Sequence, residues 1–264
     1  MILDEIAEKT RERTAAARQR ISLEDMKAKA EGMNADTGFP LEKALRNADD
    51  IAFICEVKKA SPSKGLIAPD FPYRQIAIDY EKAGASAISV LTEPYWFKGD
   101  NIYLTEIAEA VSIPVLRKDF TVDEYMIYEA KVIGASAVLL ICAILDTETI
   151  RRYIHIADSL GLSAIVEAHD ADEVKSALEA GARIIGVNNR NLKDFTVDIN
   201  NSSRYRAMVP EDIIFISESG IKTAEDIDVL RQNGTNAVLI GETLMRSADK
   251  KAELERLNGS LLKR

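Results

Sequence analysis

One short unit recurs along this chain, and it restricts the possible folds more than any other feature of the sequence. Each copy begins with a glycine that ends a helical pattern and continues into an apolar, often β-branched run typical of a strand. The copies are GASAISVLTE from Gly84, GASAVLLICA from Gly134, GLSAIVEAHD from Gly161, GARIIGVNNR from Gly181 and GTNAVLIGET from Gly234. The runs DIAFICEV, SIPVLRKDF and DIIFISESG bring the predicted strands to eight.

Helical patterns such as YRQIAIDYEKAG and TAEDIDVLRQNG fill the gaps between these strands. Strands that are apolar throughout are buried on both faces, as in a parallel sheet covered by helices. Eight such units predict a closed (β/α)8 TIM barrel. An open doubly wound sheet is the alternative, but no G-x-G-x-x-G follows the first strand to support a dinucleotide site.

The chain is predicted to be a single domain, with an N-terminal helical extension over residues 1–47 and the barrel over residues 48–264. In the extension, Ile2, Leu3 and Ile6 lie on one side of an amphipathic helical pattern. A closed barrel with a full ring of helices is already complete. We therefore expect the extension to add no core residues and to lie outside the barrel or over one end.

Composition excludes some classes of ligand. The net charge of -9 and a pI near 5.0 argue against a general nucleic-acid binder or a binder of anionic membranes, so an anionic ligand needs a local cationic site. The chain shows no basic-then-apolar signal segment and no apolar run of about 18 residues, which predicts a cytoplasmic protein. The sequence is compatible with a monomer.

Cysteine and histidine offer little chemistry. Cys55 and Cys142 lie in apolar strand-like runs, which favours buried small hydrophobic residues over a disulfide or a nucleophile. His155 and His169 are the only histidines, and no spacing gathers metal ligands, so no metal site is expected. Proton transfer is then expected to fall to lysine and glutamate.

Charged residues stand at the ends of several predicted strands. In a TIM barrel the catalytic face lies at the C-terminal ends of the strands. Glu56 and Lys58 share one face of the first strand because side chains alternate. The other polar strand ends are Lys118, Glu167, Asn188 and Glu218. Neighbouring buried lysines and glutamates suit general acid and base catalysis, while a lysine that forms a Schiff base is the alternative.

The last two units end in ISESGIKTAEDI and LIGETLMRSADK. Loops after the seventh and eighth strands are the usual phosphate site of this barrel class, where backbone N–H groups at helix starts face an anion. Ser219, Gly220 and Gly241 are the candidate residues. Ordinary helix capping and glycine turns are the competing interpretation.

These motifs together resemble the indole-3-glycerol phosphate synthase family. The resemblance rests on EVKKASPSKG, SVLTEPYWFKG, PVLRKDF, LLICAIL, VEAHD, IGVNNRNL, ISESGI and LIGETLMR, in family order, and on ILDEIAEKTRE near the N-terminus. It implies conversion of 1-(2-carboxyphenylamino)-1-deoxyribulose 5-phosphate to indole-3-glycerol phosphate, with loss of carbon dioxide and water. It implies no metal or organic cofactor and a small phosphosugar as the partner.

The resemblance also implies roles for the strand-end residues. Lys118 of the K-D-F motif would be the general acid, and Glu167 of VEAHD the base, on the opposite side of the mouth. Lys58 would be an acid, a phosphate contact or both. Glu56 and Asn188 would orient and polarise the sugar, with Glu218 facing it from the seventh strand.

For the rest of the substrate, the resemblance implies that Arg190 pairs with the carboxylate of the ring. Ser61, Pro62, Phe97 and Phe120 would contact the substrate, the last three by packing on the ring. Glu242 follows Gly241, so its carboxylate would turn away from the phosphate while its N–H donates. The extension would lie near the mouth. The open alternatives are a phosphosugar isomerase, a Schiff-base aldolase and a non-catalytic phosphosugar-binding protein.

Overall fold

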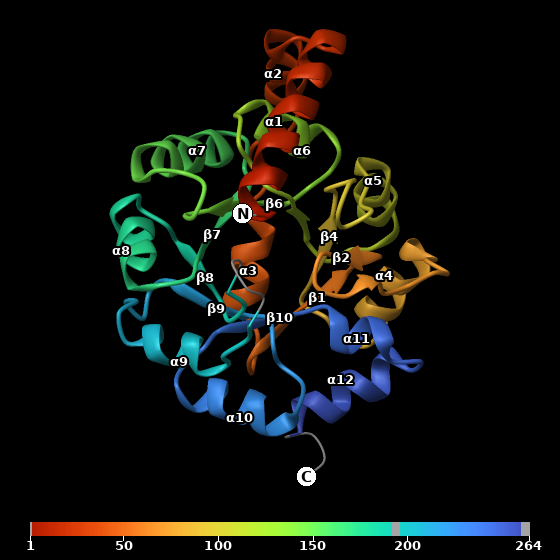
Figure 1. The fold of residues 1–264 in the computed structure, drawn as a ribbon, viewed down its shortest axis with the longest axis vertical. Coiled ribbons are helices and arrows are strands. Elements are labelled where there is room, and N and C mark those ends of the chain that lie inside the picture. Colours follow the sequence, from red (N-terminus) through yellow and green to blue (C-terminus); the bar gives the residue numbers. More distant parts are fainter. Residues whose placement is uncertain (1, 192–195, 260–264) are drawn as a thin grey trace.

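The computed structural model describes residues 2–191 and 196–259, and within these ranges eight parallel strands close into a barrel (Figure 1). The predicted TIM barrel is therefore confirmed. The strands are β1 (Ala52–Val57), β4 (Ala87–Leu91), β5 (Val115–Lys118), β6 (Ala137–Ile141), β7 (Ser163–Ala168), β8 (Ile184–Asn188), β9 (Ile214–Glu218) and β10 (Ala237–Ile240). They pair in chain order, and β1 closes the ring by pairing with both β4 and β10.

Helices surround the barrel and cover the outer faces of its strands (Figure 1). They are α4 (Tyr73–Lys82), α5 (Asn101–Ala110), α6 (Tyr125–Val132), α7 (Thr147–Ser159), α8 (Ala171–Glu179), α9 (Asn200–Arg206), α10 (Ala224–Gln232), α11 (Glu242–Arg246) and α12 (Lys250–Asn258). A small antiparallel pair, β2 (Ala60–Ser61) and β3 (Gly65–Leu66), follows β1. Within the described ranges, no helix combines the length and apolarity needed to cross a bilayer.

The repeated glycines end helices as the sequence predicts. Gly84, Gly134, Gly161, Gly181 and Gly234 all have φ between 69° and 98°, the left-handed conformation that glycine adopts without steric cost. At Gly161 a side chain would also collide with the backbone of residue 35 in the extension. The repeat therefore marks the points at which the chain turns from a helix into the next strand.

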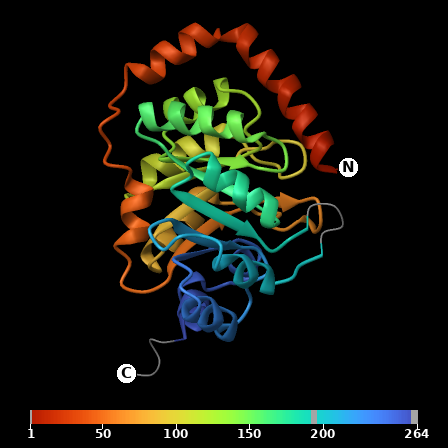
Figure 2. The same ribbon diagram turned by 90° about the vertical axis from the view of Figure 1, so that its left-hand side faces the viewer.

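The extension forms three helices, α1 (Ile2–Arg20), α2 (Leu23–Glu31) and α3 (Pro40–Arg46). Figure 2 shows α1 and α2 passing outside the barrel, with the N-terminus at the end toward which the strands point and α3 at the opposite end. The α2 helix lies along α6. The extension thus lies outside the barrel and reaches both of its ends, whereas the sequence analysis expects it outside the barrel or over one end.

The expectation that the extension adds nothing to the core is wrong. The side chains of Leu41 and Leu45, on α3, are buried among inward-facing residues of the strands, including Ile54 and Leu116. The barrel is open at the N-terminal ends of its strands, its lower end, and apolar side chains there are stable only when another element shields them from water. Leu41 and Leu45 supply that cover. The assignment of extension and barrel to one domain stays a prediction.

Candidate active site

A cavity of about 590 Å³ opens at the C-terminal ends of the barrel strands. All fifteen site residues predicted from the sequence line it: Glu56, Lys58, Ser61, Pro62, Phe97, Lys118, Phe120, Glu167, Asn188, Arg190, Glu218, Ser219, Gly220, Gly241 and Glu242. Among the described residues, six lysine and arginine side chains line the cavity against five carboxylates, although the whole chain carries a net charge of -9. The cavity is thus locally more cationic than the protein around it.

Lys118, at the end of β5, lies between two buried carboxylates. Its Nζ donates to Oε2 of Glu167 at 2.7 Å and to Oε2 of Glu218 at 2.8 Å. Lys118 and Glu167 are therefore an ion pair, and their prediction on opposite sides of the mouth is wrong. In TIM barrels, side chains from alternate strands fill one layer of the interior. Glu56, Lys118, Glu167 and Glu218 are the last or the last but one residue of the first, third, fifth and seventh barrel strands, so the layer brings them together.

The charges in this layer set one another's pKa values. Burial opposes the charge on Lys118, but the carboxylates of Glu167 and Glu218 outweigh it and raise the pKa of the ammonium. Burial likewise opposes the charge on Glu167, yet Lys118 and His169 lower the pKa of that carboxyl below its usual range. Lys118 and Glu167 are thus both charged in this arrangement.

Glu218 behaves differently from Glu167. Burial and the neighbouring charge of Glu167 outweigh the effect of Lys118 and raise the pKa of Glu218 to about 7. Its Oε1 has no hydrogen-bond partner in the described structure. The carboxyl fits only because residue 186 is a glycine, since a Cβ there would collide with this oxygen. The site therefore contains two carboxyls that interact with one lysine and differ in proton affinity.

The imidazole of His169 lies between the carboxylates of Glu167 and Glu173. Its Nε2 lies 3.3 Å from Oε1 of Glu167 and its Nδ1 lies 3.0 Å from Oε2 of Glu173. Burial lowers the histidine's pKa, but these two carboxylates raise it overall to about 10. The amide of Asn188 also donates to Oε1 of Glu167 at 3.2 Å. The sequence reasoning weighed His169 only as a metal ligand and missed this contact.

Glu56 and Lys58 share one face of the first strand, as the alternation of side chains predicts. Nζ of Lys58 lies 2.6 Å from Oε1 of Glu56. A Cβ at Gly241 would collide with the Glu56 carboxylate and would come close to the Lys58 ammonium. Gly241 therefore leaves the space that this ion pair occupies.

The two loops predicted to bind phosphate both reach the cavity. Ser219 and Gly220, after β9, have φ values of 70° and 83°. A left-handed serine is uncommon, and such backbone conformations gather at functional sites. The carboxylate of Glu242 pairs with Arg246, whose Nε donates to it at 3.2 Å, while Lys64 lies 3.7 Å away. These partners account for the orientation of a carboxylate beside a predicted phosphate site.

An aromatic surface lines another side of the cavity. The rings of Phe97 and Phe120 lie 6.0 Å apart and tilted, as favourable aromatic pairs do. Pro62 and Arg190 line the same cavity, and Nη1 of Arg190 lies 3.5 Å from Oγ of Ser63. Apolar side chains of the first helix, Ile2, Leu3 and Ile6, also line it. This places α1 at the mouth, as the resemblance implies.

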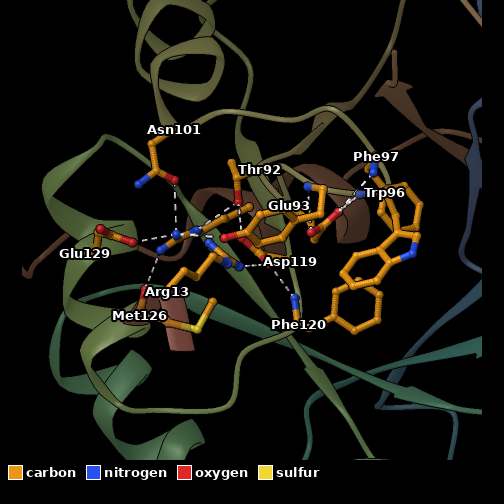
Figure 3. Close-up of polar contacts among 12 residues, drawn as sticks. Arg13, Thr92, Glu93, Trp96, Phe97, Asn101, Asp119, Phe120, Met126 and Glu129 are labelled. Carbon is orange, nitrogen blue, oxygen red and sulfur yellow. Dashed lines mark hydrogen bonds and ion pairs between the residues drawn. The ribbon is translucent and has the colours of Figure 1, made fainter. Parts of the chain in front are cut away.

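A buried charged network beside Lys118 was not predicted. Arg117 and Asp119 flank Lys118 in the sequence, and both are about 1% exposed. Figure 3 shows Asp119 meeting Arg13 and Thr92. The signal was available in PVLRKDF, because three consecutive charged residues at the end of a buried strand are unusual.

Two further observations concern cysteine and metal ligands. Cys55 is buried in β1, as predicted, but Cys142 lies just after β6 and is partly exposed. Burial raises the pKa of both thiols, that of Cys142 to about 12, so neither is an activated nucleophile. Among residues 2–191 and 196–259, no group of three or more histidine, cysteine or acidic side chains could hold a metal ion.

Fold and site together define a TIM-barrel enzyme with a buried lysine between carboxylates and two glycine-containing loops after its last barrel strands. A family model for indole-3-glycerol phosphate synthase matches residues 3–257, and the chain belongs to this family.

Two relatives carry the same name. Indole-3-glycerol phosphate synthase of Ruminiclostridium cellulolyticum is 60% identical over 260 residues, which cover 98% of this chain and 100% of the relative. That of Endomicrobium trichonymphae is 55% identical over 249 residues, which cover 94% and 96%.

Solved structures share the fold at low sequence identity. The 3-hexulose-6-phosphate synthase of Salmonella typhimurium superposes with a TM-score of 0.66 at 16% identity, covering 81% of this chain and 99% of that one. A tryptophan synthase structure from Pyrococcus furiosus gives 0.59 at 15% identity, covering 80% and 98%. At these identities the likeness concerns the fold alone.

Proposed function

We propose that this chain is a carboxy-lyase of tryptophan biosynthesis that converts 1-(2-carboxyphenylamino)-1-deoxyribulose 5-phosphate to indole-3-glycerol phosphate, carbon dioxide and water. Membership of the family supports the reaction. The observation that carries it is the ammonium of Lys118 between Glu167 and Glu218 inside the cavity. A buried ammonium is suited to polarise a carbonyl oxygen, and ring closure requires that step.

Ring closure joins a ring carbon of the substrate to the sugar carbonyl carbon. The carbonyl π electrons move onto oxygen, where Lys118 donates the proton that gives a hydroxyl. Glu56 and Asn188 are proposed to orient and polarise the sugar, and Glu218 to face it from β9. Loss of carbon dioxide then returns the electrons of the broken carbon–carbon bond to the ring.

Dehydration follows: the new hydroxyl leaves as water with a proton from an acid, for which we propose Lys58, and a proton is removed from the ring system to restore aromaticity. Glu167 is proposed as the base. Lys118 is one of the two cations that lower its pKa. When Lys118 has given up its proton, that effect is lost and Glu167 becomes a stronger base. The ion pair thus links the acid step to the base step that follows.

The two ends of the substrate fit the two sides of the cavity. We propose that Lys58 and the backbone N–H groups of Ser219, Gly220, Gly241 and Glu242 hold the phosphate. Pro62, Phe97 and Phe120 would pack on the carboxyphenyl ring, with Ser61 beside it. Arg190 would pair with the ring carboxylate through charge-assisted hydrogen bonds.

The test is to incubate the purified chain with the carboxyphenylamino substrate and follow indole-type fluorescence together with carbon dioxide release. Both should appear in equal amounts. Borohydride added during turnover should leave the activity intact, since no Schiff base forms on Lys118. If the substrate binds but is not consumed, the result would support the alternative of a non-catalytic phosphosugar-binding protein. If borohydride inactivates the enzyme and leaves substrate covalently attached, it would support the aldolase alternative.

A further inference from the structure

A second charged network surrounds Arg117 and Asp119, the residues on either side of Lys118 in the chain (Figure 3). Arg117, which is about 1% exposed, donates to Oε2 of Glu129 at 2.6 Å and to the carbonyl of Met126 at 2.8 Å. It also donates to Oδ1 of Asn101 at 3.1 Å. Arg117 thereby ties β5 to the α5 and α6 helices.

Asp119 is the other buried charge of this network. Its side chain is 0% exposed, and the guanidinium of Arg13, on α1, donates to its Oδ1. Arg117 lies farther away, with Nη2 at 3.8 Å from Oδ2. Arg13 lowers the pKa of Asp119 against the opposing effect of burial. The N-terminal helix therefore supplies the direct charged partner of a carboxylate that neighbours Lys118 in the chain.

Thr92, just after β4, joins Asp119 to the backbone of Lys118. Its Oγ1 donates to Oδ2 of Asp119 at 2.6 Å, and its backbone N–H donates to the carbonyl of Lys118 at 3.2 Å. Oδ1 of Asp119 accepts the backbone N–H of Phe120 at 2.8 Å. The residues on both sides of Asp119 are thus fixed by hydrogen bonds to this network.

The network continues into the aromatic surface through Glu93, which is fully buried. Its carboxylate accepts the backbone N–H groups of Tyr95, Trp96 and Phe97 at 2.8 to 3.0 Å (Figure 3). These contacts hold the segment that carries Phe97 against Phe120. Two sets of polar contacts, joined in the chain where Thr92 is followed by Glu93, therefore reach from α1 to Lys118 and to the aromatic surface.

We propose that Arg13 and Asp119 form a latch that couples docking of α1 over the cavity to the placement of Lys118 and Phe120. Arg13 and Asp119 are positioning residues, since they act on the reacting groups through Thr92 and the backbone of β5. Loss of Arg13 leaves Asp119 charged, buried and without its nearest cation, which is a costly state. We therefore expect Asp119 and the adjacent end of β5 to move so that the carboxylate reaches water, and α1 to lose one of its contacts with the barrel.

The kinetic part of this inference rests on the proposed function. Displacement of a reacting group by about 1 Å costs on the order of 100-fold in rate. Arg13→Gln and Asp119→Asn should each lower kcat by about 10-fold to 100-fold, measured well below the melting temperature of each variant. The double variant should fall no lower than the worse single variant by more than about twofold, because the two residues act as one pair.

Arg18→Gln is the matched control. Arg18 lies on the same helix and pairs with Asp123, which follows β5, at 3.0 Å, but this pair is 41% and 30% exposed. Exposed pairs contribute little, so kcat should stay within about twofold of the parent. Arg13→Lys keeps the charge without the planar guanidinium and should recover part of the lost rate.

Trp96 provides a readout that does not need catalysis, because it is the single tryptophan of the chain and is held by Glu93. Arg13→Gln should shift its emission or increase its quenching by acrylamide, and Arg18→Gln should not. If the parent protein makes no product, the proposed function fails and the Trp96 measurement still tests the latch. Parental emission and quenching in Arg13→Gln, or additive losses of kcat in the double variant, would overturn the inference.

Discussion

The carboxyl of Glu218 lies beside Lys118 and Glu167, in a space that residue 186 leaves open by having no side chain. Two carboxylates so close to one ammonium cannot both be charged at low cost. Glu167 has Asn188 and His169 as further partners, whereas Oε1 of Glu218 has no hydrogen-bond partner in the described ranges. This difference explains why the pKa of Glu218 is raised while that of Glu167 is lowered.

Glu218→Gln should therefore stabilise the protein at alkaline pH while it lowers activity. The folded pKa of about 7 lies above the ordinary value of 4.5, so ionisation of Glu218 costs stability as pH rises through this interval. Gln mimics the protonated carboxyl and avoids that cost. At pH 8 the free energy of unfolding should rise by on the order of 1 to 3 kcal/mol, and the gain should vanish near pH 4. Urea unfolding at the two pH values provides the measurement, and equal effects at both would contradict the assignment.

His169 should lose its contribution to stability with rising pH as well, but over a higher pH range. Its folded pKa of about 10 lies above 6.5, so its contribution is complete below pH 6.5 and declines until it is lost as pH passes 10. His169→Gln should lower the free energy of unfolding most at pH 6 and progressively less toward pH 10. His155→Gln is the control, because His155 is exposed on α7. A deficit in His169→Gln that grows with pH would show that the imidazole is neutral.

At the level of elements, the repeat predicts five of the barrel strands because each is an apolar run that follows a left-handed glycine, and the other three are predicted from their apolar runs alone. The position of α3 could not be predicted in this way. An amphipathic helix shows that one face is buried but does not name its partner. Leu41 and the strand residues that it packs against, such as Ile54 and Leu116, are more than ten residues apart in the chain, and only the folded structure brings them together.

Leu41→Ala should destabilise the whole protein, since its side chain is 0% exposed inside the barrel end. Large-to-small changes at such positions cost about 2 to 5 kcal/mol. Leu66→Ala, at a position that is 56% exposed, should cost far less. Equal midpoints of thermal unfolding in the two variants would show that α3 does not close the barrel. Deletion of residues 1 to 44 would remove Leu41 and open the core for the same reason. Deletion of residues 1 to 20 would remove only α1, which lines the cavity, and would leave α3 in place.

For the molecule as a whole, the strand ends were predictable because a TIM barrel fixes where its catalytic face lies. Which of those residues touch could not be predicted, as Lys118 and Glu167 show, because side-chain length and the alternation of layers decide it. Arg13 was equally hidden, since its partner Asp119 lies 106 positions away in the chain. The overall charge of -9 also gave no sign of the local cations that line the cavity.

The central claim is that Lys118 supplies the proton for ring closure, and the kcat of Lys118→Met tests it most directly. Met keeps an unbranched chain and removes the ammonium, so kcat should fall by about 100-fold to 10,000-fold, with circular dichroism unchanged and substrate binding largely retained. Lys118→Gln, whose amide keeps two N–H donors on a shorter chain, replaces it if the Met variant does not fold. Lys175→Met, at an exposed position on α8, is the control and should keep the parental kcat. A folded Lys118 variant that forms indole-3-glycerol phosphate at the parental rate would contradict the account.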